Sequence, residues 1–205
     1  PILEALATGA ARVASELDEL TAVLPPRDGL LAITTRLDEA GIPWAIGGSA
    51  LLAALGLVDR VNDWDVQVTH DPEPLRFLFA GVPHTYFEHG GCHADWKLSF
   101  EAERTELIPH FAFFAPYGVV RIPLHRTREW NGLPIASPEG WACAYWLMGR
   151  YDEHEQRARR ATCAEALFAW LREHGADATR VRELLREPLP PELAERFERL
   201  LAAQA

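Results

Sequence analysis

The stretch Ile46-Gly47-Gly48-Ser49, followed after a short apolar segment by Asp63-Trp64-Asp65-Val66, decides how this chain folds. Residues 43–46 have the composition of a buried strand, and residues 49–55 have the spacing of a helix. Glycines let the intervening backbone turn sharply and approach a ligand, and the first N–H groups of a helix lack partners within it. The turn therefore suits a phosphate. A strand–turn–helix corner also needs glycine and a serine cap for purely structural reasons, so both interpretations stay open.

The second part of the stretch places two carboxylates on one side of a strand. If residues 63–68 are extended, Asp63, Asp65 and Gln67 share one face, and the apolar residues between them form the other. Neighbouring carboxylates repel each other unless a cation or a proton lies between them. Mg²⁺ typically uses one or two protein carboxylates and completes its octahedron with water and substrate phosphates. The pair predicts a magnesium site; two solvated aspartates at an exposed strand end are the alternative.

In this order the features resemble the nucleotidyltransferase superfamily, whose fold is similar to the palm of polymerase beta. The shared pattern is an apolar strand, a Gly-Ser turn, a helix, an Asp-x-Asp strand and a third acidic residue on a later strand. The resemblance implies that Gly47, Gly48 and Ser49 bind a nucleoside triphosphate. It also implies that Asp63 and Asp65 are catalytic and bind Mg²⁺, or in its place Mn²⁺.

The third acid of the pattern is predicted at Glu106, where the family more often has aspartate. Its carboxylate would complete the catalytic metal site. His110 shares the strand face, but four strand residues span about 13 Å, so His110 and Glu106 cannot bind one metal. Lys97 lies in a neighbouring strand-like run and is a candidate to bind the nucleotide by neutralising charge on its phosphates. A surface lysine without a role is the alternative.

Hydrophobic periodicity and turn residues predict the other elements. Helices are expected at residues 2–24, 28–40 and 72–80, with Leu75, Phe77, Leu78 and Phe79 buried in the last of these. Strands are expected at residues 85–87, 96–100, 105–114 and 119–124, and a hairpin at Asn131-Gly132. Ser137-Pro138-Glu139 predicts a helix start. Further helices are expected at residues 152–174, 177–186 and 191–201.

Three features are similar to those that follow the catalytic sheet in lincosamide-type and abortive-infection-toxin-type nucleotidyltransferases. They are the hairpin, the Ser-Pro-Glu helix start and the run Ala144-Tyr145-Trp146-Leu147-Met148-Gly149-Arg150. Trp141, Tyr145 and Met148 are interpreted as packing. The basic residues at 157–160 are interpreted as a solvated helix face, with contact to phosphates or tRNA as the alternative.

The predicted fold is α+β, with a mixed, mostly antiparallel sheet flanked by helices. A catalytic domain is expected at 1–136, including N-terminal helices, and a helical part packed on it at 137–205.

Composition narrows the class of protein. The 205 residues carry a formal net charge of −10, which disfavours duplex DNA as a partner. Three widely spaced cysteines and the lack of a long apolar run predict a cytoplasmic protein that does not cross a membrane. The segment His89-Gly90-Gly91-Cys92-His93 matches no standard zinc spacing, so a glycine turn is preferred there to a zinc site.

The resemblance implies transfer of a nucleoside monophosphate from an NTP such as ATP to an acceptor hydroxyl, with release of pyrophosphate. The acceptor is left open among a small molecule, a protein and a tRNA end. Two alternatives remain: a catalytically silent module of the same fold that binds nucleotide or a protein or RNA partner, and a structural α/β protein in which the acids are incidental.

Overall fold

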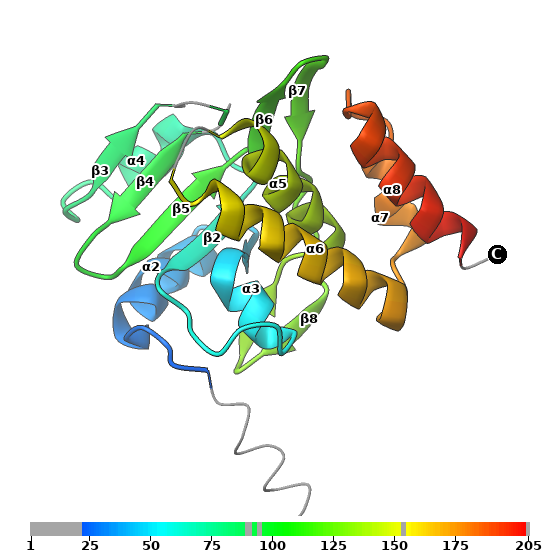
Figure 1. Ribbon diagram of the computed structural model, residues 1–205. Helices are drawn as coiled ribbons and strands as arrows, with labels where there is room; N and C mark the ends of the chain where they lie inside the picture. The colour runs from blue at the N-terminus through cyan, green and yellow to red at the C-terminus, as the bar shows by residue number, and fades with distance from the viewer. Residues whose placement is uncertain (1–21, 89–91, 94–95, 153–154, 204–205) are drawn as a thin grey trace, which may run out of the picture.

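The computed structural model describes residues 22–88, 92–93, 96–152 and 155–203 of the chain (Figure 1). Most of the helix expected at residues 2–24 lies outside them. In chain order the elements are α2 (Arg27–Glu39), β1 (Trp44–Ile46), α3 (Gly48–Ala54), β2 (Trp64–Val68), α4 (Pro72–Leu78), β3 (Thr85–Phe87), β4 (Lys97–Phe100), β5 (Thr105–Pro109), β6 (Ala112–Ala115), β7 (Gly118–Arg121), β8 (Arg128–Trp130), β9 (Leu133–Ile135), α5 (Pro138–Tyr151), α6 (Arg157–His174), α7 (Ala178–Leu184) and α8 (Pro191–Ala202).

The main sheet has the strand order β3-β4-β5-β2-β1-β9-β8. The β2–β5 and β1–β9 pairs are parallel, and the other neighbours are antiparallel. Strands β6 and β7 form a separate two-stranded sheet. The predicted mixed, mostly antiparallel sheet with flanking helices and a C-terminal helical part is therefore confirmed. In Figure 1, α6 passes in front of α3, whereas α7 and α8 lie at the right of the view, beyond α5 and α6.

The centre of the sheet follows the predicted alternation. Trp64 and Val66 are fully buried, whereas Asp65 between them is partly exposed. Gln67, on the face of Asp65, is buried, and its Nε2 donates a hydrogen bond of 2.8 Å to the carbonyl oxygen of Ile122. The Asp65 end of β2 is thus partly exposed to solvent, and the Gln67 end is buried.

The single strand expected at residues 105–114 is wrong. Strand β5 ends at Pro109, and the chain continues into β6 of the second sheet. Proline lacks the N–H that a ladder requires, and His110 has a φ of 49°, in the left-handed region where a strand cannot continue. This break separates His110 from the acidic residues on the strands.

Three helix expectations also need correction. Phe77 was expected in the core but is 85% exposed, because it lies roughly 200° around α4 from both Leu75 and Phe79, which are buried. Val23, expected at the end of the first helix, instead forms a β-bridge with Arg60. The helix expected from residue 152 begins at Arg157, after a break at Asp152, where the backbone is extended.

Local signals predicted the start of α5 and the hairpin before it. Asn131 and Gly132 have φ angles of 52° and 73°, which suit the tight turn between β8 and β9. The Ser137 hydroxyl accepts a hydrogen bond of 3.0 Å from the Gly140 N–H and so caps α5. A Cβ at Gly149 would lie 2.8 Å from the backbone of Ala161, so this glycine permits the close packing of α5 on α6.

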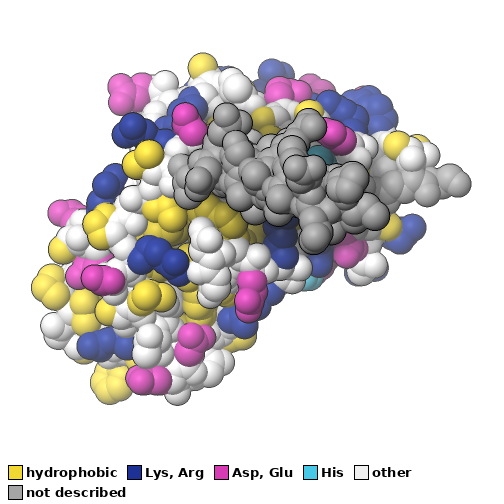
Figure 2. Space-filling model, turned by 90° about the horizontal axis from the view of Figure 1, so that it is seen from below, with side chains coloured by type: hydrophobic (Ala, Val, Ile, Leu, Met, Phe, Trp, Pro, Cys, Tyr) yellow, Lys and Arg dark blue, Asp and Glu magenta, His cyan; other side chains and the backbone are white. Residues whose placement is uncertain are grey.

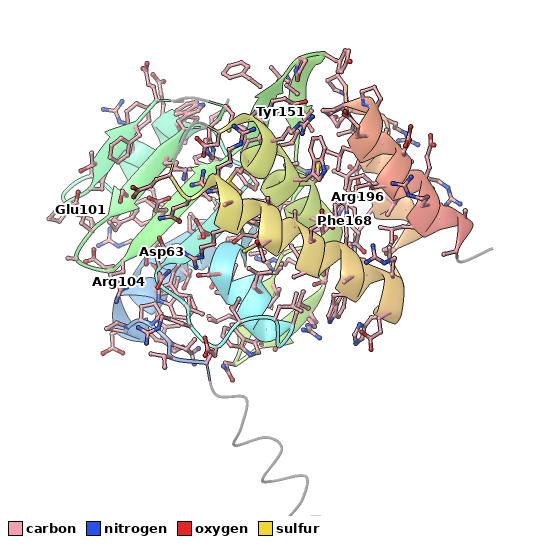
Figure 3. All side chains as sticks on the ribbon, in the orientation of Figure 1. Asp63, Glu101, Arg104, Tyr151, Phe168 and Arg196 are labelled. Carbon is pink, nitrogen blue, oxygen red and sulfur yellow. The ribbon has the colours of Figure 1, made fainter. Side chains whose placement is uncertain are left out.

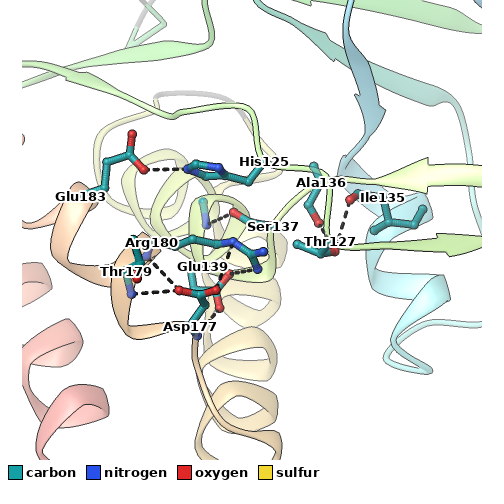
Figure 4. A network of polar contacts seen from close by, with 11 residues as sticks. His125, Thr127, Ile135, Ala136, Ser137, Glu139, Asp177, Thr179, Arg180 and Glu183 are labelled. Carbon is teal, nitrogen blue, oxygen red and sulfur yellow. Dashed lines mark hydrogen bonds and ion pairs between the residues drawn. The ribbon is translucent and has the colours of Figure 1, made fainter.

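A polar network ties the C-terminal helices to the rest of the molecule (Figure 4). The buried Glu139 carboxylate accepts a hydrogen bond of 2.8 Å from the Asp177 N–H, and Arg180 lies 3.8 Å from its other oxygen. His125 Nε2 lies 2.7 Å from a carboxylate oxygen of Glu183 on α7. The boundary expected at residue 136 stays a prediction, and the contact between His125 and Glu183 crosses it.

The surface carries both signs of charge. On the described part of the face in Figure 2, Lys and Arg side chains are interspersed with Asp and Glu rather than gathered into a basic stripe. Among the described helices, none combines the length and the apolar character needed to cross a membrane.

Candidate active site

The glycine turn is shaped by two side chains that occupy the space of missing Cβ atoms. Gly48 has a φ of 56°, and a Cβ on it would lie 1.7 Å from Asp65 Oδ2. A Cβ on Gly47 would lie 1.9 Å from the indole ring of Trp141. The Gly47 N–H also donates a hydrogen bond of 2.8 Å to the Asp65 carbonyl oxygen. Both glycines are therefore required by close packing, and the turn is fastened directly to the acidic strand.

Ser49 follows the turn in the first helical positions of α3. Its side chain is 7% exposed, and its Oγ has no hydrogen-bond partner within the described residues. A buried hydroxyl without a partner is unfavourable, so such a group is expected to meet a ligand. Ser49 lines a cleft that also contains the acidic side chains, so its hydroxyl and the carboxylates face the same space.

The three predicted carboxylates meet in that cleft. Asp65 on β2 and Glu106 on β5 are directly opposite each other in the parallel ladder, so their Cα atoms are neighbours across adjacent strands. Side chains opposite each other in a ladder point to the same face of the sheet. Asp63 precedes β2, and all three residues line the cleft. The structure thus brings Asp63, Asp65 and Glu106 together as the sequence predicted.

Burial and mutual repulsion perturb these acids. Burial raises the pKa of Asp65 to about 8, and the charges of Asp63 and Glu106 add to the shift. Burial likewise raises the pKa of Asp63, with Glu106 contributing, whereas Lys97 and Arg104 act in the opposite direction. Asp63 and Arg104 lie at the same end of the β2–β5 pair (Figure 3). A bound cation would favour the charged carboxylates that the protein alone disfavours.

Lys97 lies on β4, the strand beside β5. Its Nζ donates a hydrogen bond of 3.0 Å to Glu106 Oε2, and its side chain lines the cleft. The predicted nucleotide-binding lysine is therefore next to the carboxylates, where its charge offsets part of theirs. His110, the other candidate considered for the third acid's position, lies outside this cleft, with its Nε2 3.0 Å from Asp71 Oδ1.

The opposite wall of the cleft comes from α5 and α6. The cleft has a volume of about 390 Å³. Trp141, Tyr145 and Met148 were interpreted as packing; they are buried, and they also line the cleft. Arg159 and Arg160 were expected on a solvated face; Arg159 is exposed and Arg160 is partly buried, and both also line the cleft. Their position depends on how α6 packs, and the basic run at residues 157–160 is the signal in the sequence that pointed to it.

The residues present fit a divalent cation with a preference for oxygen. Three carboxylates converge, which is a donor set that Mg²⁺ or Mn²⁺ accepts. The backbone of Gly48 closes against Asp65 so tightly that this carboxylate has little freedom to turn away. Cationic groups from Lys97, Arg159 and Arg160 stand around the acids, where an anionic substrate would be bound.

Neither a protein-family model nor a curated protein matches the sequence. Solved structures match in fold. The solution structure of the antibiotic-resistance factor ANT(2'')-Ia has 17% sequence identity and a TM-score of 0.50, covering 86% of this chain and 92% of that chain. The same factor in complex with adenylyl-2''-tobramycin has 14% identity and a TM-score of 0.48, covering 88% and 100%. A Thermotoga maritima protein described as a candidate nucleotidyltransferase has 22% identity and a TM-score of 0.43, covering 70% and 91%.

The first of these similarities establishes the fold. It extends over 86% of this chain and 92% of that chain, so this chain shares the fold of ANT(2'')-Ia. At this level of identity the similarity concerns backbone architecture, and the chemistry has to be argued from the cleft.

Proposed function

We propose that the protein is a Mg²⁺-dependent nucleotidyltransferase that transfers a nucleoside monophosphate from an NTP to an acceptor hydroxyl and releases pyrophosphate. The observation that carries the proposal is the convergence of Asp63, Asp65 and Glu106 in the cleft that also contains the buried, unpartnered Ser49 hydroxyl. A carboxylate cluster alone would fit many metal sites. The buried Ser49 hydroxyl at a glycine turn beside the cluster favours a metal-bound triphosphate as the ligand.

Each residue has a role that follows from its position. The Ser49 hydroxyl donates to a phosphate oxygen, and the glycines let Trp141 and Asp65 pack against the turn that positions this hydroxyl. Asp63, Asp65 and Glu106 would hold Mg²⁺. When bound, the ion neutralises the triphosphate, polarises the reacting phosphoryl group and lowers the pKa of the attacking hydroxyl. Lys97 offsets negative charge that develops on the phosphates.

The acceptor side is proposed to lie along α5 and α6. Trp141 and Tyr145 offer aromatic surface, and Arg159 and Arg160 offer cationic groups. The Trp141 indole N–H is buried without a hydrogen-bond partner in the described part of the chain, so it is a donor available to a ligand.

None of the three cysteines, all within the described residues, forms a disulfide, which supports our proposal of a reducing, cytoplasmic location.

The test is incubation of the protein with each of the four labelled NTPs, Mg²⁺ and either a cell extract or pools of small-molecule, tRNA and protein acceptors. We expect one class of acceptor to become labelled and an equivalent of pyrophosphate to be released. Asp65→Asn and Glu106→Gln should each reduce transfer by about 10³-fold, because each removes a metal-binding charge from the transition state.

Asp71→Asn is the matched control, since it removes an aspartate charge outside the cleft. Circular dichroism of all variants checks that they are folded. Full turnover in folded Asp65→Asn would disprove the assignment. Nucleotide binding with neither labelling nor pyrophosphate release in the wild type would identify a silent module in place of an enzyme.

A further inference from the structure

Cys92, His93 and Asp152 form a second cluster of potential metal ligands, outside the carboxylate site. One ligand atom from each residue lies within 4.8 Å of the other two, and His93 Nε2 lies 3.7 Å from Asp152 Oδ2. Cys92 is 5% exposed and Asp152 is 9% exposed. His93 also lines the active-site cleft, so the cluster borders it.

The backbone on both sides of the cluster is held in place. The Phe114 N–H donates a hydrogen bond of 2.6 Å to the Cys92 carbonyl oxygen, and His93 forms a β-bridge with Phe113. The imidazole also packs on the Phe113 ring, with the ring centroids 4.9 Å apart. Residues 92–93 are therefore fastened to β6. Asp152 ends α5, where its N–H donates to the Met148 carbonyl oxygen at 3.2 Å.

The donor types select the metal. A cysteine thiolate and an imidazole suit zinc, whereas Mg²⁺ prefers oxygen ligands alone. In a tetrahedral zinc site the ligand atoms lie roughly 3.3–3.8 Å from one another, so the cluster needs to contract by only about 1 Å. The two negative charges of a thiolate and a carboxylate balance a divalent ion in this mostly buried place.

Arg160 provides a partner for the carboxylate. Its guanidinium forms an ion pair with Asp152 Oδ2 from the adjacent helix α6. Carboxylates that bind metals are commonly hydrogen-bonded by a second group, which orients them toward the ion. One oxygen of Asp152 can bind the metal while the guanidinium holds the carboxylate from the α6 side.

We propose that Cys92, His93 and Asp152 bind one Zn²⁺, with water in the fourth position. The ion fastens residues 92–93, and with them β6, to the junction between α5 and α6. Through this junction it holds the helical wall of the cleft against the sheet. The three ligands are distinct from Asp63, Asp65 and Glu106, so zinc content can be measured separately from nucleotidyl transfer.

The sequence alone disfavoured zinc at this place. Cys92 and His93 are adjacent, and no second Cys or His pair follows at a standard spacing. The third ligand is an aspartate nearly sixty residues later in the chain, at the end of a helix. Only the packing of α5 against β6 brings it to the other two.

The test is the metal content of the full-length protein purified from zinc-supplemented medium and dialysed. We expect one zinc per chain by mass spectrometry, and in Cys92→Ser and Asp152→Asn a fall to near zero. Cobalt substituted for zinc should give a thiolate-to-metal charge-transfer band that Cys92→Ser abolishes. Removing zinc should lower the melting temperature of the wild type, and adding Zn²⁺ should restore it.

Two control variants locate the ion. Cys163→Ser removes a different cysteine at the cleft, and Asp65→Asn alters the carboxylate site; both should keep one zinc. Zinc content well below one per chain in the wild type would overturn the proposal, as would full zinc content in folded Cys92→Ser. Zinc lost in Asp65→Asn but kept in Cys92→Ser would place the ion among the carboxylates, which also contradicts it.

Discussion

The carboxylate site and the Cys92–His93–Asp152 cluster lie beside one cleft but are built in different ways. Asp65 and Glu106 sit opposite each other in a strand ladder, and Asp63 directly precedes the same strand. The second cluster joins a segment on β6 to the end of α5. Residues in a ladder keep their spacing through backbone hydrogen bonds, whereas the second cluster depends on how a helix packs.

The two sites therefore depend on their surroundings in different ways. The carboxylates of the first site repel one another. Burial, together with this repulsion, raises the pKa of Asp65 and Asp63. Rigid neighbours and cationic side chains hold these carboxylates together. The second cluster is proposed to fasten segments together rather than to react. The predictions below test each half of this contrast, from the largest expected effect to the smallest.

Gly48→Ala should damage the carboxylate site most. The new Cβ would lie 1.7 Å from Asp65 Oδ2, at a φ of 56°. Displacement of Asp65 by this contact should reduce transfer by at least about 10²-fold. Left-handed strain and overpacking together should cost about 3 kcal/mol in the free energy of unfolding, measured by urea denaturation.

Gly41→Ala is the control for Gly48→Ala. Gly41 has a φ of 67°, but a Cβ there meets nothing within 4 Å. It should lose only about 1–2 kcal/mol from the left-handed backbone and keep its activity. Zinc content should stay at one per chain in both variants. Equal losses of activity at the two positions would contradict the role given to close packing at Gly48.

The stability of the magnesium-free protein should fall as pH rises. The pKa of Asp65 is about 8 in the folded protein, against 3.8 for an ordinary aspartate. Between these values the folded protein holds a proton that the unfolded chain has released, so the free energy of unfolding decreases with pH. The Asp65 contribution is complete below about pH 4 and is lost as pH rises through about 8.

Chemical denaturation at several pH values in magnesium-free buffer measures this effect. Asp65→Asn should show a weaker decline and exceed the wild type in stability at about pH 8, and added Mg²⁺ should restore the wild type there. A wild type that becomes more stable from about pH 5 to 8 without Mg²⁺, while Asp65→Asn does not, would reverse the sign and contradict the buried, repelled state of this carboxylate.

Ser49→Ala should mainly weaken NTP binding, whereas Ser137→Ala should mainly lower the free energy of unfolding, and both effects should be modest. The Ser49 hydroxyl has no partner, so its removal should change the free energy of unfolding by less than about 1 kcal/mol while weakening NTP binding by about tenfold. The Ser137 hydroxyl caps α5, so its loss should cost about 1 kcal/mol and leave NTP affinity unchanged. Titration calorimetry and thermal unfolding measure both. Unaltered NTP affinity in Ser49→Ala would exclude this hydroxyl from the phosphate site.

Errors in the predicted elements have physical causes. Strand composition continued from Thr105 to Phe114, but Pro109 and the left-handed backbone at His110 divided the run between two sheets. Phe77 is as apolar as Leu75, yet its angular position on α4 leaves it exposed. Composition records how apolar a segment is, and it does not record which side of the segment finds a partner.

The sequence by itself determined the local features of this protein. The glycine turn, the alternation of Asp63 and Asp65 with buried Trp64, the Asn131-Gly132 hairpin and the cap of α5 all depend on neighbouring residues. Their physical basis is local: backbone freedom at glycine, a period of two in strands, and hydrogen bonds within a few residues.

Only the tertiary structure decided which distant residues meet. It placed Glu106 opposite Asp65 through the parallel pairing of β2 and β5, and it brought Arg159 and Arg160 to the cleft through the packing of α6. It also joined Asp152 to Cys92 and His93. Strand order and helix packing minimise the free energy of the whole chain, so no short stretch of sequence specifies them.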